Sequence, residues 1–330
     1  MPTWKRIRDE GAGFLYSLSE SLAIVDWRHP TLLEPATDGM MIIVSDYSGQ
    51  HKLASHEAYS FLVTTDRALD EWQFIRLEFR KRWLPDGRRI SFKQLSEPTR
   101  WRALVPFLNT ANSIRGNMIT FLIDRRIGSF IEGGADALLE AFPDCFSPET
   151  RPSTMEKMLR LSSFVAMLTA GLREEDQRSL WISDHDETLA SFDRREQFGR
   201  LCSYLTFGLT GWRNPADMEF GTTESPYAPP WAEDAASIPD LVAGAYCQLS
   251  RLLPAHCGTE TWTRTVPSTA MKDRRARAVS NWMATAHDRL HHVLLRLELG
   301  DEGEPRASAQ FFAGTRAPPR AAAPYTADCG

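Results

Sequence analysis

The sequence predicts an α/β protein in which helices flank a mixed β-sheet. Short apolar runs of strand length alternate with longer segments in which apolar residues recur every three or four positions. Two runs, MMIIVSDYSG at 40–49 and GNMITFLIDRR at 116–126, are apolar over consecutive residues, as in strands buried on both faces. Hydrophobic residues make up 42% and charged residues 25% of the 330-residue chain, which is an ordinary globular composition.

The first quarter of the chain predicts a helix, two strands and a second helix. A helix is predicted within residues 4–24, and a loop leads from it into a strand at 40–46. The next strand, at 57–65, follows a polar connection of hairpin type. Apolar residues then recur at helical spacing over 66–83, which predicts an amphipathic helix with a basic end.

Turn and capping residues divide the segment that follows. The triplet PDG at 85–87 ends the helix, and RRISFKQL predicts a short strand around 89–93. Ser96 is a suitable N-cap for a helix that has Pro98 in its first turn. The run at 116–126 predicts the third long strand.

The second half is predicted to be mainly helical around one further strand. Ser153 and Glu156 have the spacing of a capping box at the start of a helix that runs through 158–172. The remaining predicted elements are a strand at 179–187, a helix at 188–208, a loop at 213–236, a helix from Ser237, a long helix at 270–298 and a disordered tail from 301.

Composition and motifs narrow the function classes. The formal net charge of −5 argues against a protein that coats nucleic acid through bulk charge, but it allows a local basic surface. The five cysteines lack Cys-x-x-Cys spacing, which favours reduced thiols in a cytoplasmic protein. No signal-peptide core and no run of ~18 apolar residues is found, so we expect a soluble protein with no membrane partner. Phosphate loops, nucleophile elbows and dinucleotide fingerprints are also missing from the sequence.

Acidic residues follow three of the predicted strands. Asp46 ends the first strand, Asp124 ends the third, and Asp184 and Asp186 end the strand at 179–187. A carboxylate at the mouth of an apolar strand is costly unless a cation meets it. Asp240 opens a helix that continues with the small residues LVAGA, so this helix can pack tightly against a sheet and bring its acid near the strand ends.

Five short motifs carry a family resemblance. They are IIVSDYSG at 42–49, RRISFKQL at 88–95, NMITFLIDRR at 117–126, LWISDHDE at 180–187 and IPDLVAGA at 238–245. Together they resemble the ribonuclease-H-like family called domain of unknown function 3800, over roughly residues 39–253. The resemblance implies a metal-dependent, nuclease-like site in which Asp46, Asp184 and Asp240 hold the metal. The sequence departs from the family pattern at Tyr47, where the family has Glu, and at Pro239, where it has Ala.

The resemblance also implies a domain organisation. A ribonuclease-H-like mixed sheet flanked by helices is expected over 39–253, with a helical insertion around 127–175. An N-terminal helical segment at 1–38 precedes it. A C-terminal helical extension at 254–300 and the tail at 301–330 follow it.

Clustered carboxylates suit the chemistry of phosphodiester cleavage. Two divalent ions about 3.5–4 Å apart can activate a water molecule and neutralise the charge that builds up on the phosphate. Mg²⁺ and Mn²⁺ prefer oxygen ligands, so three or four carboxylates without a Cys or His cage are the expected signature. We therefore expect a Mg²⁺- or Mn²⁺-dependent nuclease that uses Asp46, Asp184 and Asp240, with Asp186 or Asp124 as a fourth ligand.

Each acid also has a structural interpretation. Asp46 suits a turn or a helix cap, and Asp240 suits the first turn of a helix, where it would interact with the helix dipole. Asp124 precedes Arg125 and Arg126, which favours an ion pair at the end of the strand as much as metal ligation.

Basic residues at the predicted strand around 89–93 suggest the substrate. Arg88, Arg89 and Lys93 are candidates for phosphate contacts, and the choice between DNA and RNA stays open. His287 and His291 are four residues apart on the predicted final helix, but no third ligand accompanies them. The alternative function, favoured by Tyr47, is a catalytically impaired module that binds nucleic acid or a protein partner. A homo-oligomer is also compatible with the sequence.

Overall fold

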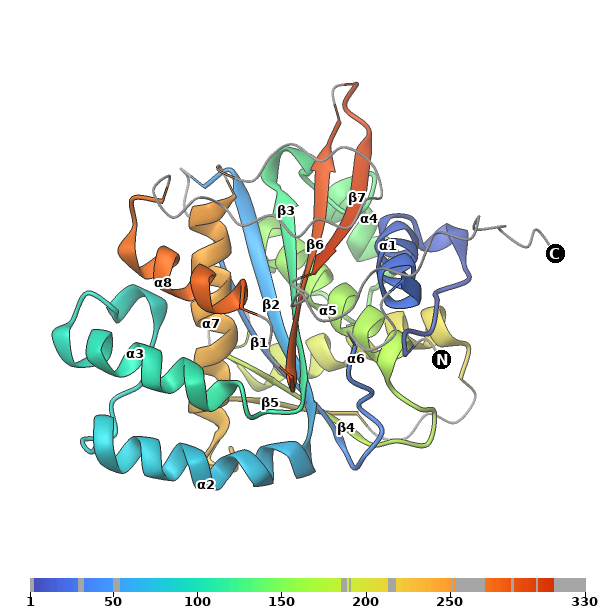
Figure 1. Cartoon of the computed structure of the whole chain (residues 1–330). Helices are drawn as coiled ribbons and strands as arrows, with labels where there is room; N and C mark the ends of the chain where they lie inside the picture. The colour runs from blue at the N-terminus through green and yellow to red at the C-terminus, as the bar shows by residue number, and fades with distance from the viewer. Residues whose placement is uncertain are drawn as a thin grey trace.

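A mixed sheet organises the chain, with helices on both of its faces (Figure 1). The computed structural model describes residues 3–28, 33–49, 54–184, 189, 191–212, 218–250, 252, 271–285, 288–300 and 302–311. Within these residues seven strands pair in the order β5-β4-β1-β2-β3-β6-β7. The predicted α/β architecture, a mixed sheet flanked by helices, is therefore confirmed.

Strand directions place most carboxyl ends at one edge of the sheet. The strands are β1 (Met41–Ser48), β2 (His56–Thr65), β3 (Gly116–Asp124), β4 (Ser179–Ser183), β5 (Met218–Thr222), β6 (Leu290–Leu299) and β7 (Pro305–Phe311). Among these strands, β2 runs antiparallel to both of its neighbours, β1 and β3, and β7 runs antiparallel to β6. The other neighbouring strands pair in parallel. The carboxyl ends of β1, β3, β4, β5 and β6 consequently meet at a common edge.

Helices cover both faces of the sheet and enclose two cores. The helices are α1 (Phe14–Arg28), α2 (Asp66–Trp83), α3 (Pro98–Ala111), α4 (Gly134–Ala141), α5 (Pro152–Leu172), α6 (Phe192–Thr210), α7 (Ala232–Leu249) and α8 (Arg274–Met283). Three short 3-10 turns are η1 (Glu10–Ala12), η2 (Phe92–Gln94) and η3 (Arg125–Ile127). One face packs against α1, α4, α5 and α6, and the other against α2, α3, α7 and α8 (Figure 1).

Alternation along the strands divides apolar side chains between the two cores. In β1, Met41 and Ile43 enter the core beneath α5, whereas Ile42 and Val44 enter the core beneath α7. Successive side chains of β1 point to opposite faces of the sheet, and both faces are buried. The strand is therefore apolar at consecutive positions. The small residues of α7 allow close packing on this sheet. At Gly244 a Cβ atom would lie 2.3 Å from the ring of Phe92.

The predicted strand at 89–93 is wrong. These residues run outside the sheet and end in η2. Ile90 and Phe92 are buried in the core beneath α7, which explains their strand-like alternation. The Phe92 N–H donates to the Asp240 carboxylate of α7 rather than to a neighbouring strand.

Two of the C-terminal predictions are wrong in part. The long helix expected at 270–298 is split into α8 and the strand β6, which pairs with β3 and β7. Residues 305–311 form β7 instead of a disordered tail, and those beyond 311 lie outside the described part. Residues 290–299 therefore belong to the sheet and not to a helical extension.

Several boundaries differ from the sequence predictions. Helix α1 begins at Phe14, and α5 begins at Pro152 without a capping box, because the Glu156 carboxylate instead accepts hydrogen bonds from Ser129 and the Phe130 N–H. The loop predicted at 213–236 contains β5, which is a short strand at the edge of the sheet. Helix α7 begins at Ala232, five residues before the predicted start.

Candidate functional site

Three aspartates line one cavity at the edge where the parallel strands end. The cavity has a volume of about 430 Å³. Asp46 comes from β1, Asp184 directly follows β4, and Asp240 comes from α7. The other lining residues are Tyr47, Ser48, Gly49, Arg89, Ser91, Phe92, Lys93, Gln94 and Gly244. Residues that are far apart in sequence thus supply three carboxyl groups to a single polar cavity.

Asp46 is the most deeply buried of the three acids. It lies in β1, and its Oδ1 accepts a hydrogen bond of 2.6 Å from the N–H of Tyr47. Burial raises its pKa well above the ordinary range, and the charges of Asp240 and Asp184 raise it further. The Arg89 guanidinium opposes this rise without cancelling it.

Asp184 is fixed by both of its neighbouring strands. Its N–H donates to the carbonyl of Ser45, which continues the parallel pairing of β4 with β1 by one residue. Its Oδ1 accepts from the Thr223 hydroxyl at 3.0 Å and from Arg89 Nη1 at 2.7 Å. Thr223 directly follows β5, so the ends of three adjacent strands position this carboxylate.

Asp240 lies in the middle of α7 and faces the cavity. Its Oδ2 accepts a hydrogen bond of 2.6 Å from the Phe92 N–H. Burial raises its pKa to about 6, although the Phe92 hydrogen bond and the Arg89 charge act in the opposite direction. Because α7 begins at Ala232, Asp240 is not in the first turn, and the helix-dipole interpretation of this residue is wrong.

Arg89 links two of the acids. Its Nη1 donates to Asp184, and its Nη2 lies 3.4 Å from Asp46 Oδ2. Its Nε is buried without a hydrogen-bond partner within the described part of the chain. A single guanidinium thus pairs with two carboxylates beside a third, and Lys93 at the same cavity adds a further positive charge that lowers the pKa of Asp240.

A buried ion-pair network holds the segment that carries Arg89. Asp234 of α7 pairs with Arg80 of α2, and Arg80 Nη1 also donates to the carbonyl of Arg88 at 2.7 Å. Arg100 of α3 donates to the carbonyl of Arg89 at 2.8 Å. Sequence reasoning missed this network, because no local pattern connects residues that are 154 positions apart.

The three carboxylates suit a hard cation such as Mg²⁺, but Arg89 already pairs with two of them. Three carboxylates provide the oxygen ligands that Mg²⁺ and Mn²⁺ prefer. Among the residues that the structure describes, however, no group of three or more His, Cys, Asp or Glu side chains is positioned to hold a metal ion. Arg89, which pairs with Asp46 and Asp184, would compete with a divalent cation for these carboxylates.

Other predicted site residues lie elsewhere. Asp124 lines a separate cavity beside His56, and its carboxylate pairs with Arg126 and caps η3, as the ion-pair interpretation predicts. Asp186 lies outside the described residues. Arg88 pairs with Asp86 and does not line the cavity of the three acids.

One member of the expected histidine pair lies in a strand. His291 lies in β6, so the expected placement of His287 and His291 on one helix is wrong, and His287 falls outside the described ranges.

Tyr47 lies on the opposite face of the sheet from the acids. Its ring packs against the core beneath α5, and Lys157 Nζ lies 3.9 Å from the ring centroid. Neighbouring strand residues point to opposite faces, so the side chain at position 47 is directed away from that of Asp46. Position 47 therefore supplies its side chain to that core and not to the face on which Asp46 and Asp240 meet.

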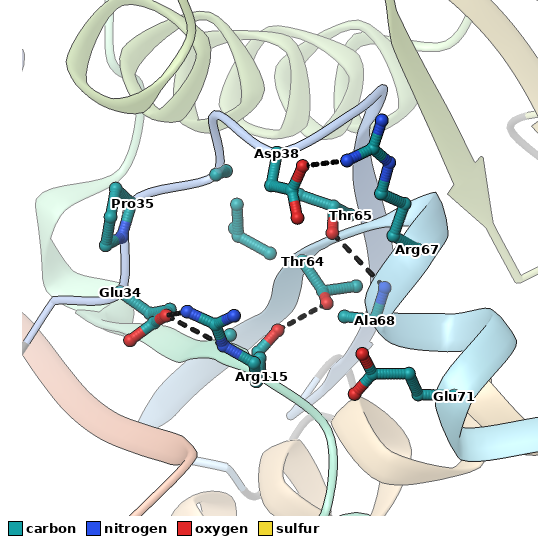
Figure 2. A pocket seen from close by; sticks show the side chains of 12 residues that line it. Glu34, Pro35, Asp38, Thr64, Thr65, Arg67, Ala68, Glu71 and Arg115 are labelled. Atoms are coloured by element: carbon teal, nitrogen blue, oxygen red, sulfur yellow. Dashed lines mark hydrogen bonds and ion pairs between the residues drawn. The ribbon is translucent and has the colours of Figure 1, made fainter.

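A small hollow of about 30 Å³ lies at the other edge of the sheet (Figure 2). Its charged side chains form ion pairs: Arg67 with Asp38, Arg115 with Glu34, and Glu71 with Arg289. The Thr64 hydroxyl donates to the carbonyl of Arg115 at 2.6 Å. These contacts account for its polar groups, so the larger cavity with three acids is the candidate functional site.

No protein-family model matches the sequence, and no curated protein matches it. The resemblance to domain of unknown function 3800 therefore depends on the short motifs alone. In the residues that the structure describes, no helix is long and apolar enough to cross a membrane.

Proposed function

We propose that this protein is a divalent-cation-dependent nuclease of the ribonuclease-H-like type. The observation that carries the proposal is the meeting of Asp46, Asp184 and Asp240, from three separate elements, in one cavity at the carboxyl edge of the sheet. The order β3-β2-β1-β4-β5, in which only β2 is antiparallel to the others, supports the ribonuclease-H-like layout.

Electrostatics favours a cation at these acids. Asp46 and Asp240 both have raised pKa values, chiefly because of burial, so their ionised forms are poorly compensated in this arrangement. Arg89 is the one cation paired directly with the acids in the described part of the cavity. Mg²⁺ or Mn²⁺ held by the three aspartates would neutralise charge on a phosphate and activate a water molecule.

The basic side chains of the cavity suit binding of the phosphate groups of the substrate. Arg89 has a planar guanidinium that suits a phosphate as well as a carboxylate, and Lys93 lines the same cavity. We propose that Arg89 transfers from the acids to a backbone phosphate of the nucleic acid. The Phe92 N–H meanwhile keeps the Asp240 carboxylate oriented toward the cavity.

The experiment is a cleavage assay with labelled single- and double-stranded DNA and RNA, over a titration of Mn²⁺ or Mg²⁺. We expect cation-dependent cleavage that falls at least ~100-fold in Asp46→Asn and in Asp240→Asn, as is usual when a charge-stabilising group is removed. Asp124→Asn is the matched control, because this acid lies in a different cavity, and it should retain cleavage. Cleavage that survives both site substitutions would refute the assignment.

A second candidate function is binding of nucleic acid without cleavage. The ion pairs of Arg89 with Asp46 and Asp184 favour it, because they supply a positive charge to these two acids without a metal, although burial still keeps the pKa of Asp46 raised. In this case nucleic acid binds with strong salt dependence, and Mn²⁺ produces neither cleavage nor a change in thermal stability. The titration described above therefore separates the two candidates.

A further inference from the structure

Helix α2 exposes apolar side chains on the face that points away from the core. Its inner face buries Leu69, Trp72 and Phe79. On the outer face, however, Phe74 is 77% exposed and Leu77 is 46% exposed. Large apolar side chains that adjoin each other on a surface mark interaction sites more often than isolated ones do.

Charged residues flank this apolar pair in a symmetric order. Asp70 lies one turn before Phe74, and Lys81 lies one turn after Leu77, so all four share one face of the helix. Both charged residues are exposed. Their positions are symmetric about the midpoint between Ile75 and Arg76, because Asp70 and Lys81 are equally distant from it, as are Phe74 and Leu77.

We propose that α2 forms the interface of a homodimer in which the helices of two copies pack antiparallel. A two-fold axis at the helix midpoint would place Phe74 against Leu77 of the second copy and Asp70 against its Lys81. The same surface then serves both subunits, as in an isologous interface. Helix α2 lies along the lower rim of the molecule, beneath α3, where a second copy can approach (Figure 1).

Charge complementarity identifies a second copy as the partner. In an antiparallel pair, Asp70 of each copy lies opposite Lys81 of the other copy. The ion pair therefore forms twice, once on each side of the axis. A parallel arrangement would place like charges together, which opposes binding. Lys81 already pairs with Glu78 of its own helix at 2.6 Å, so the second copy's Asp70 would join an exposed ion pair.

The size of the interface sets the strength of the dimer. Stable interfaces usually bury about 800 Å² on each partner, which is more than one helix face with two large apolar residues provides. We therefore expect a concentration-dependent dimer with a Kd of about 1–100 μM, in the range of transient complexes.

Sedimentation velocity over about 1–300 μM protein tests the proposal, with this range chosen to bracket the expected affinity. Phe74→Ser should weaken dimerisation at least ~tenfold, because it removes the central apolar contact from both halves of the interface. Phe207→Ser is the matched control: this residue is 59% exposed on α6, which covers the other face of the sheet, and its loss should leave the dimer unchanged.

Charge reversal provides a test of the orientation. Asp70→Lys and Lys81→Asp should each weaken the dimer, because each places like charges together twice. Combining both reversals in one chain should restore it, since each introduced lysine then faces an introduced aspartate of the second copy. Melting curves establish that the variants fold.

Three outcomes would overturn the proposal. They are a monomer at every concentration, a dimer that Phe74→Ser leaves intact, and a failure of the double reversal to restore association. None of these outcomes bears on cleavage, because the acids of the cavity are on other elements.

Discussion

Arg89 is the residue on which the charge balance of the cavity depends. Its guanidinium pairs with Asp46 and Asp184, so it competes with any divalent cation for the same carboxylates. Arg89→Gln removes both ion pairs, so it should strengthen Mn²⁺ binding by about tenfold while weakening the binding of nucleic acid. Calorimetry with Mn²⁺ and fluorescence anisotropy with labelled oligonucleotides measure the two effects.

The neighbouring arginine provides the control for this substitution. Arg88 pairs with Asp86 at the surface, outside the cavity, so Arg88→Gln should leave Mn²⁺ binding unchanged. Weaker Mn²⁺ binding in Arg89→Gln would contradict competition between the guanidinium and the cation.

Asp240 predicts how the stability of the metal-free protein depends on pH. Its pKa is about 6 in the folded state and near 3.8 when the chain is unfolded, so the folded protein binds the proton more tightly. The stability that Asp240 contributes is therefore fully present below about pH 4 and is lost as the pH rises through about 6. In Asp240→Asn this loss is absent, so the variant gains up to about 2 kcal/mol relative to wild type between pH 4 and pH 8.

Urea denaturation in a metal-chelating buffer at a series of pH values measures this difference. Asp46 adds a loss of the same sign in both proteins, because its pKa is also raised. If the free energy of unfolding of Asp240→Asn fell relative to that of wild type with increasing pH, the result would contradict the raised pKa of Asp240.

At single positions, the sequence predicted the location of the acids more accurately than their contacts. Asp46 lies near the end of β1 and Asp184 follows β4. Both strands are apolar enough to recognise, and strand ends converge at a sheet edge by geometry alone. Their pairing with Arg89 was not predictable, because it depends on how an irregular segment crosses the edge of the sheet. Such a path leaves no periodic signal in the sequence.

At the scale of elements, the contact between α7 and η2 shapes the cavity. Gly244 lets the ring of Phe92 lie directly on α7, and the N–H of the same residue holds Asp240. Gly244→Ala would place a Cβ atom 2.3 Å from that ring, so η2 must shift. We expect a loss of about 1–3 kcal/mol in the free energy of unfolding, together with weaker cation binding.

Gly208→Ala is the control for this substitution. Gly208 lies in α6, and a Cβ atom there would meet nothing within 4 Å. An alanine at this helical position should stabilise the protein by about 0.5–1 kcal/mol. Equal effects of the two substitutions in chemical denaturation would show that the contact with Phe92 has no special importance.

The elements that the sequence predicted are those with a clear periodicity. β1, β2 and β3 are long apolar or alternating runs, and α2 has a helical stripe with Thr65 as its N-cap. In β6 the run LHHVLLRLEL suits a buried helix as well as a strand, and pairing with β3 decides between them. β5 has only two large apolar residues, Met218 and Phe220, and includes Gly221, so its apolar signal is too weak to identify a strand.

On the scale of the whole molecule, the candidate site exists only when the sheet and α7 are assembled together. Asp46 is fixed by the pairing of β1, Asp184 by the register of β4 with β1 and β5, and Asp240 by the packing of α7 on the sheet. A ligand that binds all three acids therefore stabilises the whole fold, because the unfolded chain does not bring them together.

Thermal unfolding with Mn²⁺ tests this coupling. At a cation concentration of about 100 Kd, the folded protein should gain about 2.7 kcal/mol. The gain should be larger at pH 8 than at pH 5, because protons compete for the carboxylates whose pKa values are raised, and Asp240 is largely protonated below about 6. Asp46→Asn should remove most of the gain, whereas Asp124→Asn should preserve it. A cation effect of equal size at both pH values and in both variants would place the bound cation elsewhere on the molecule.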